Sequence, residues 1–161
     1  MPGILIIAHA PLASALRACA EHVYGSRPPG LEALDVQPDA DTQALLGQAE
    51  QAIARLSAGG GEVLVLADTA GATPCNTARR LVFDAAGAAR LRLVGGVNLP
   101  MLLRCLCYRA EGLDRLIERA VEGGQRAIAE IEADDAPRAR AAPCEPCAAA
   151  AATYPCPDST S

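Results

Sequence analysis

The stretch ILIIAHAPLASAL, residues 4–16, joins a candidate buried strand to a candidate helix and carries a histidine at the junction. Ile4–Ala8 is a continuous apolar run of strand length, and Pro11–Tyr24 has apolar residues at helical spacing. A continuous apolar strand is typical of a parallel sheet that is covered by helices on both faces. His9, one of two histidines in the chain, therefore lies where the strand leaves the core.

The same alternation of short apolar runs and longer helical periods continues to about residue 131. Strands alternating with helices predict an α/β fold. We expect a flavodoxin-like parallel sheet in the order 2-1-3-4, because right-handed crossovers leave few topologies. The further strands that we expect are Leu31–Val36, Glu62–Ala67 and Arg90–Val97. The further helices are Thr42–Ser57 (capped by Asp41), Pro74 to about Ala86, one from about Pro100, and Leu113 to about Ile131.

Length and composition restrict the class of protein. The 161 residues suit one domain, and 51% of them are apolar, which is enough for a core without disulfides. The chain has one Phe, three Tyr and no Trp, its basic residues are all arginines, and its net charge is −5. These features disfavour nucleic-acid binding, which uses basic surfaces and stacked aromatic rings.

The N-terminal apolar run does not have the features of a signal peptide, because no basic residue precedes it and polar residues interrupt it. No stretch reaches the ~18 apolar residues of a membrane helix. We therefore expect a soluble, cytoplasmic protein that does not insert into the membrane. We expect four cysteines in apolar segments to act as small hydrophobic residues: Cys19, Cys75, Cys105 and Cys107.

The composition changes near the C-terminus. Residues 134–161 are rich in proline, alanine and cysteine, and we expect them to be a disordered tail after a domain formed by residues 1–133. Cys144 and Cys147 have the spacing of half a zinc site, and Cys156 offers a third ligand. A structural zinc site takes four ligands, so we expect no bound metal. We also expect no cofactor.

The topology predicts a functional site where the strand order reverses, since ligands bind there beyond the carboxyl ends of parallel strands. In the order 2-1-3-4 this point lies between the strands that end at His9 and Asp68. A carboxylate bonded to a histidine fixes its tautomer and makes the other ring nitrogen more nucleophilic. The pair suits a general base, a metal ligand or a nucleophile. His22 lies within a helix, and we expect it at the surface.

The loop DTAGATPCN, residues 68–76, favours a phosphate over a cation. Thr73 and Pro74 suit the N-cap and the first residue of a helix, and Gly71 allows the backbone to approach a ligand closely. The free N–H groups of the first helical turn and the helix dipole then form an anion site. Pro11 marks another helix start beside the histidine, so we expect two helix N-termini to face the imidazole.

Three motifs, ILIIAHAPLA, VLADTAGATPCNTARRL and GVNLPMLLRCL, together resemble the enzyme IIA components of the mannose class (mannose/fructose/sorbose) of the bacterial phosphoenolpyruvate-dependent sugar phosphotransferase system. The resemblance covers about residues 3–132. It implies a flavodoxin-like sheet with an additional antiparallel edge strand that is exchanged across a homodimer. It also implies a relay in which the histidine-containing phosphocarrier protein phosphorylates His9 and a IIB component accepts the phosphoryl group during sugar uptake.

The same resemblance implies roles for individual residues. His9 is the nucleophile that becomes a phosphohistidine, and Asp68 orients and charges its ring. Asn98 shapes the loop that follows the fourth strand. The residues that would bind the phosphate are Thr69, Gly71, Thr73 and Asn76.

The motifs also depart from the family pattern. Ala10, Ala70 and Ala72 replace two glycines and a tryptophan that are frequent there, and Thr73 replaces serine, so the surface that faces a partner is expected to differ. We expect no fused IIB domain after residue 133, and a stand-alone IIA component that signals by its phosphorylation state is one alternative. A tetrapyrrole metal chelatase is a remote alternative, because such enzymes begin similarly but need a second metal-binding histidine or acidic cluster.

Overall fold

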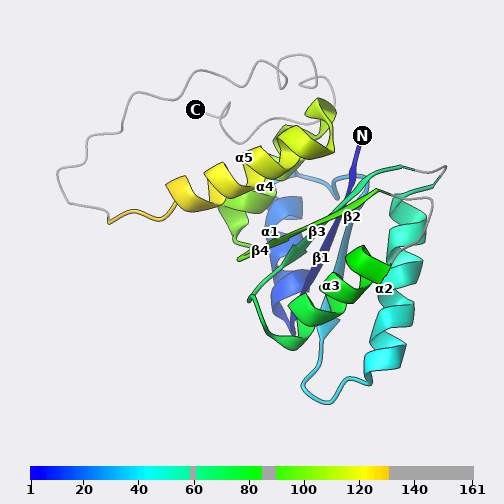
Figure 1. Ribbon diagram of the computed structural model, residues 1–161. Helices are drawn as coiled ribbons and strands as arrows, with labels where there is room; N and C mark the ends of the chain where they lie inside the picture. The colour runs from blue at the N-terminus through cyan, green and yellow to red at the C-terminus, as the bar shows by residue number, and fades with distance from the viewer. Residues whose placement is uncertain (59–60, 85–89, 131–161) are drawn as a thin grey trace, which may run out of the picture.

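A computed structural model of the chain describes residues 1–58, 61–84 and 90–130. Within these ranges, four parallel strands form one sheet in the order β2-β1-β3-β4, and helices cover both of its faces (Figure 1). The α/β class and the strand order expected from the sequence are confirmed. The predicted tail, with its three cysteines, lies outside the described residues.

The observed elements follow the predicted ones closely along the chain. The strands are β1 (Gly3–His9), β2 (Leu31–Val36), β3 (Val63–Ala67) and β4 (Leu91–Gly95). The helices are α1 (Leu12–Tyr24), α2 (Thr42–Leu56), α3 (Thr73–Asp84), α4 (Leu99–Cys107), the 3-10 helix η1 (Arg109–Glu111) and α5 (Leu113–Arg126).

Two predicted boundaries were too long. β4 ends at Gly95 because Gly96 turns the chain, with a φ of +81°, and its N–H donates to the Asp68 carbonyl at 2.9 Å. α5 ends at Arg126 instead of continuing to about Ile131. Ile128 is 80% exposed, so no core contact holds that segment in a helix.

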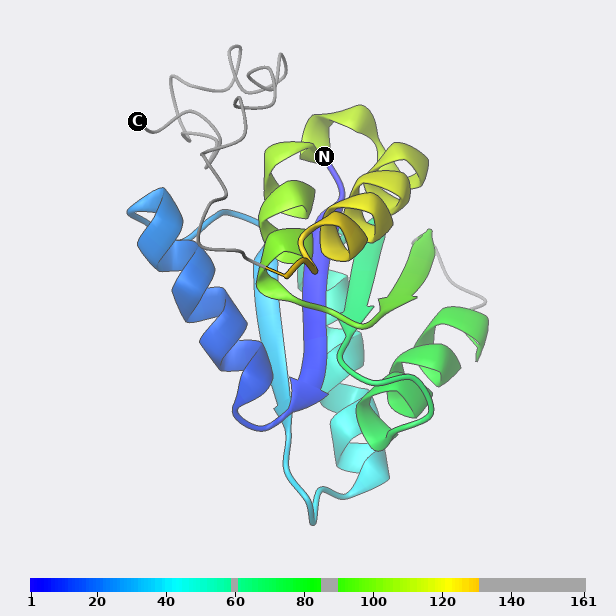
Figure 2. The ribbon, with the colours of Figure 1, turned by 90° about the vertical axis from the view of Figure 1, so that its left-hand side faces the viewer.

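β1 lies between β2 and β3, and both of its faces are buried (Figure 2). Ile4, Ile6 and Ala8 pack against apolar residues of α1, α4 and α5 on one face. Leu5 and Ile7 pack against α2 and α3 on the other face. This double burial explains why the strand appears in the sequence as a continuous apolar run.

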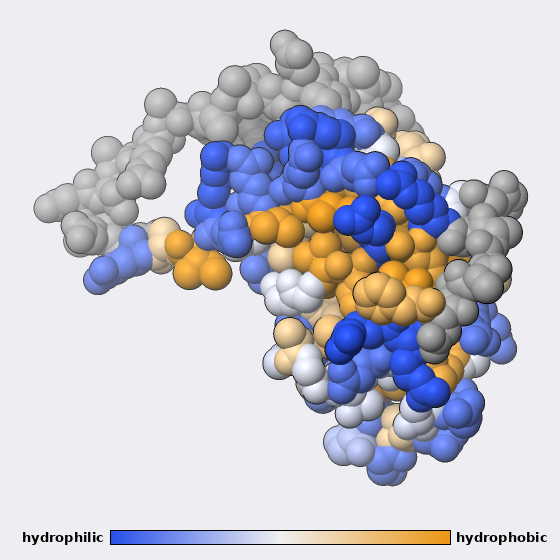
Figure 3. Space-filling model, viewed as in Figure 1, coloured by the Kyte–Doolittle hydropathy of each residue, from blue (hydrophilic) through white to orange (hydrophobic). Residues whose placement is uncertain are grey.

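Within the part of the chain that the structure describes, β4 pairs with β3 only and its outer edge carries no strand. The antiparallel edge strand implied by the resemblance is therefore not among the described residues. The surface over this edge, between α5 and α3, is largely apolar (Figure 3).

Two of the four cysteines expected to be small hydrophobic residues behave otherwise. Cys75 and Cys105 are buried as expected, but Cys19 is exposed on α1 and Cys107 is disulfide-bonded. The apolar segment containing Cys19 is amphipathic, and this residue falls on its outer face. None of the described helices has the length and apolar content needed to cross a membrane.

We expect Ile6→Ala to lower the free energy of unfolding by about 2–5 kcal/mol, because Ile6 is fully buried and its truncation leaves a cavity. Urea denaturation followed by circular dichroism measures this loss. Ile128→Ala is the matched control, since the same atoms are removed from an exposed side chain and a change within about 0.5 kcal/mol is expected. Equal losses in the two variants would contradict the buried position of β1.

Candidate functional site

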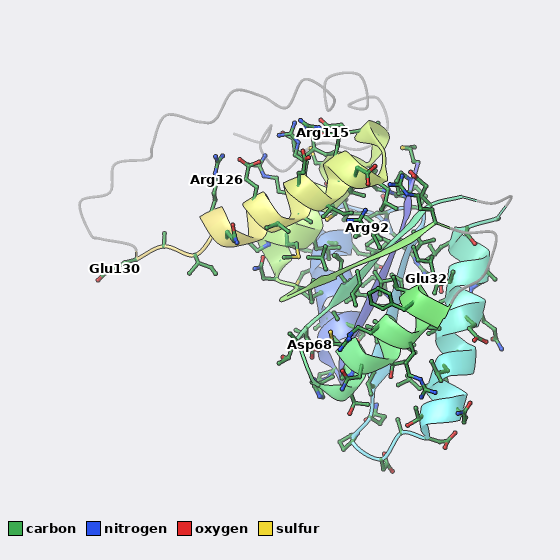
Figure 4. The ribbon with its side chains drawn as sticks, in the orientation of Figure 1. Glu32, Asp68, Arg92, Arg115, Arg126 and Glu130 are labelled. Carbon is green, nitrogen blue, oxygen red and sulfur yellow. The ribbon has the colours of Figure 1, made fainter. Side chains whose placement is uncertain are left out.

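His9 and Asp68 meet at the carboxyl end of the sheet. His9 is the last residue of β1, and Asp68 directly follows β3, the neighbouring strand (Figure 4). Asp68 Oδ2 lies 2.6 Å from His9 Nδ1 and accepts a hydrogen bond from the His9 backbone N–H at 2.9 Å. The structure thus brings together the two residues that the predicted strand order placed side by side.

The two side chains differ sharply in exposure, since the carboxylate is 7% exposed and the imidazole 54%. Burial raises the pKa of Asp68, but hydrogen bonds from the His9 backbone, the His9 ring and the Thr69 N–H outweigh it, so that this pKa lies below its ordinary value. Asp68 is therefore ionised near neutral pH and can only accept hydrogen bonds. It follows that Nδ1 of His9 carries a proton and that, in the neutral ring, Nε2 is the nitrogen with the free lone pair.

The loop between Asp68 and α3 is held by contacts within itself. Thr69 N–H donates to Asp68 Oδ1 at 2.7 Å, and Ala72 N–H donates to Thr69 O at 3.3 Å. Gly71 has a φ of +85°, which suits glycine, and its carbonyl accepts a hydrogen bond from Asn76 Nδ2 at 3.0 Å. Asn76, expected as a phosphate ligand, thus also braces the loop.

The start of α3 differs from the prediction by one residue. Ala72 O accepts the first helical hydrogen bond, from Asn76 N at 2.9 Å, so Ala72 is the N-cap and Thr73 is the first helical residue. The predicted N-cap role of Thr73 is wrong, because the turn before the helix brings the preceding carbonyl into helical register. Among the described residues, nothing accepts a hydrogen bond from the N–H groups of Ala70, Gly71 or Thr73. These free donors and the helix dipole favour an anion.

The start of α1 is satisfied by a carboxylate from β2. Pro11 is the N-cap and makes no side-chain cap, while Ser14 N–H donates to Asp35 Oδ1 at 3.1 Å and Ser14 Oγ donates to Pro11 O at 2.9 Å. The expectation of two open helix N-termini beside His9 is therefore only partly met. Sequence reasoning missed Asp35, although a proline at an N-cap is a signal that an acceptor must come from elsewhere.

The two other polar residues named in the sequence analysis, Asn98 and His22, lie outside the His9–Asp68 pair. Asn98 caps α4, since its Oδ1 accepts from Met101 N–H at 3.0 Å, and the predicted structural role is confirmed. His22 is exposed in the last turn of α1, as predicted. In residues 1–58, 61–84 and 90–130, no group of three His, Cys, Asp or Glu side chains is arranged to hold a metal ion, which gives the chelatase alternative no support.

Comparisons with known proteins agree with this geometry. The family described as "PTS system fructose IIA component" matches residues 3–132, which is most of the chain. The chain belongs to this family. The mannose-class resemblance is thereby confirmed, and membership supports a phosphocarrier role in the sugar phosphotransferase system.

The relatives of this IIA component include longer proteins and solved structures. The "PTS system mannose-specific EIIAB component" of Escherichia coli K12 is 33% identical over 143 residues, covering 88% of this chain and 43% of the relative. The chain thus spans less than half the length of the curated relatives that it matches.

The mannose/sorbose specific IIA subunit from Enterococcus faecalis is 25% identical, with a TM-score of 0.69 over 84% of this chain and 98% of that chain. A phosphotransferase component EIIA from Streptococcus agalactiae, 22% identical with a TM-score of 0.69 over 81% and 97% of the two chains, has the same fold.

We expect the stability that Asp68 gives this IIA component to depend on pH. A carboxylate whose pKa is lower in the folded chain than in the unfolded chain stabilises the fold fully above the unfolded pKa of about 4, and this contribution is lost as the pH falls through the folded pKa. The difference in unfolding free energy between wild type and Asp68→Asn should therefore shrink as the pH falls from about 5 to below about 4.

Urea denaturation in steps of pH measures this difference. Asp39→Asn is the control, because Asp39 is exposed and has no hydrogen bond or ion pair with the described residues. A wild-type advantage over Asp68→Asn that stays constant into acid would show that the hydrogen-bonded carboxylate is not the source of the stability.

Proposed function

We propose that this IIA component carries a phosphoryl group on Nε2 of His9, received from a phosphohistidine donor and passed to an acceptor domain. The observation that carries the proposal is the contact between Asp68 and the His9 ring. It holds the proton on Nδ1 and leaves a nucleophilic nitrogen on a half-exposed side chain.

The reaction needs only groups that this pair and the donor provide. The Nε2 lone pair attacks phosphorus, the nitrogen–phosphorus bond of the donor breaks, and the donor ring leaves with the bonding electrons. The His9 ring gains positive charge while Nδ1 keeps its proton, and the ionised Asp68 stabilises that charge. Transfer onward repeats the exchange in reverse. Positioning and charge stabilisation supply most of the catalysis in phosphoryl transfer.

The loop after Asp68 is the proposed binding site for the phosphoryl oxygens. Its unpaired N–H groups at Ala70, Gly71 and Thr73 and the dipole of α3 favour negative charge. The exposed Thr69 and Thr73 hydroxyls have no partner among the described residues and can donate as well. Asn76 keeps the loop in shape through the Gly71 carbonyl.

The proposed donor is the histidine-containing phosphocarrier protein, and the proposed acceptor is a IIB component, with the exchange taking place in the cytoplasm. Family membership and the EIIAB name of the Escherichia coli relative support this pair of partners. A stand-alone regulatory role would use the same histidine, and it would differ in having no IIB component that drains the phosphoryl group.

Phosphorylation from phosphoenolpyruvate, enzyme I and the phosphocarrier protein tests the proposal. Wild type should acquire an acid-labile label, His9→Ala should acquire none, and Asp68→Ala should react about 100-fold more slowly because its ring is no longer oriented. His22→Ala is the matched control, since it removes the other, exposed histidine and should label like wild type.

Equal labelling of His9→Ala and wild type would overturn the proposal. Nitrogen NMR of the phosphorylated chain should show the substituent on Nε2, and a substituent on Nδ1 would contradict the role given to Asp68. Transfer of the label to an added IIB component distinguishes the relay from the regulatory alternative.

We also propose a homodimer formed at the open edge of β4. A groove lies beside this edge, with Arg79, Arg92 and the 77% exposed Phe83 among its lining. Arg92 is labelled in Figure 4. Exposed strand edges and large apolar patches are generally covered. An antiparallel strand of a second copy, as the family resemblance implies, is the proposed occupant of this edge.

Light scattering after size-exclusion chromatography tests the dimer. Wild type at micromolar concentration should have the mass of two chains, and Phe83→Lys should weaken association at least about tenfold by placing a charge in the apolar interface. Val23→Lys, a partly exposed position on α1, is the control and should remain dimeric. A wild type that is monomeric throughout would contradict the proposal.

A further inference from the structure

The first turn of α1 lacks an acceptor of its own. An N-cap residue normally accepts a hydrogen bond from the second or third helical N–H through its side chain. Pro11 occupies this position and its side chain has no acceptor, so the N–H of Ser14, the third helical residue, depends on another part of the chain. Asp35 in β2 supplies the acceptor at 3.1 Å.

The contact between Asp35 and Ser14 can affect the position of His9, because only a short segment separates His9 from the first turn of α1. β1 ends at His9 and α1 begins at Leu12, so two residues lie between the imidazole and the anchored helical turn. Ala10 N–H donates to Val36 O at 3.0 Å, which ties the same short segment to the end of β2. A displacement of the first turn of α1 would therefore move the backbone of His9.

The segment from His9 to the first turn of α1 is thus held by hydrogen bonds from both strands that neighbour β1. On the β3 side, Asp68 accepts from the His9 N–H and contacts the ring. On the β2 side, Asp35 lies opposite Ala8 in the parallel register and accepts from the first turn of α1. One carboxylate contacts the ring, and the other contacts the helical turn that follows the residue carrying it.

We propose that Asp35 is a positioning residue for phosphoryl transfer at His9, acting as the hydrogen-bond acceptor that fixes the start of α1. This inference rests on the proposed function of His9. In the described residues Asp35 makes no hydrogen bond or ion pair with the imidazole or with the loop of residues 68–76, so its proposed effect is on the alignment of Nε2 and not on the chemistry of the ring. Small misplacements of reacting groups reduce rates strongly while leaving binding of the partner intact.

The test compares Asp35→Ala and Asp35→Asn in the full chain, with single-turnover phosphorylation by the phosphocarrier protein. Asp35→Ala should react about tenfold more slowly at saturating donor, with an unchanged apparent affinity for the donor. Asp35→Asn should stay within about twofold of wild type, because an amide oxygen accepts from a helix N-terminus as well as a carboxylate does. Asp35→Thr, which suits a strand but has a shorter side chain, should behave like Asp35→Ala.

Asp41→Ala is the matched control. Asp41 is also a helix-capping carboxylate, since its Oδ2 accepts from Ala44 N–H at 2.8 Å, but it belongs to α2. It should lose a similar amount of stability in urea and keep its phosphorylation rate within about twofold of wild type.

Three results distinguish failure of the positioning role, of the acceptor role and of the proposed function of His9. If Asp35→Ala and Asp35→Thr react as fast as Asp41→Ala, the positioning role is overturned. If Asp35→Asn is as slow as Asp35→Ala, the acceptor role is overturned. A wild-type chain without label on His9 would instead overturn the proposed function, so the two failures are distinguishable.

Discussion

One buried carboxylate, Asp68, holds together the parts from which the site is built. It accepts hydrogen bonds from the backbone and the ring of His9 and from the N–H that begins the following loop. The end of β1, the tautomer of the imidazole and the path of the loop of residues 68–76 all depend on it. Because its hydrogen bonds lower its pKa in spite of burial, it remains charged while it does so.

The helix starts differ in whether a side chain accepts a hydrogen bond from their first turn. Asp35, Asp41 and Asn98 each accept a hydrogen bond from the first turn of a helix, at α1, α2 and α4 respectively. In the described residues, no side chain accepts from the first turn of α3. Of these four helix starts, the one that follows Asp68 is thus the one without a side-chain acceptor in the described residues, while one N–H of each of the other three is occupied.

The fold and the central pair were predictable from the sequence because both follow from strand order. Buried apolar runs identify parallel strands, and the order 2-1-3-4 then places His9 beside Asp68 without any knowledge of side-chain contacts. Asp35 was not predictable in this way. Its contact with Ser14 spans 21 residues and depends on the register between β1 and β2, which the apolar pattern does not determine.

Two backbone hydrogen bonds connect the end of β4, the edge strand, to Asp68 and the end of β3. The turn after β4 begins at Gly96, whose N–H donates to the carbonyl of Asp68, and Val97 N–H donates to Ala67 O in β3. A shift of β4 therefore pulls on the backbone of the residue that holds the imidazole. Anything that binds along β4 and fixes its position would also restrict the backbone of Asp68, on which the orientation of the His9 ring depends.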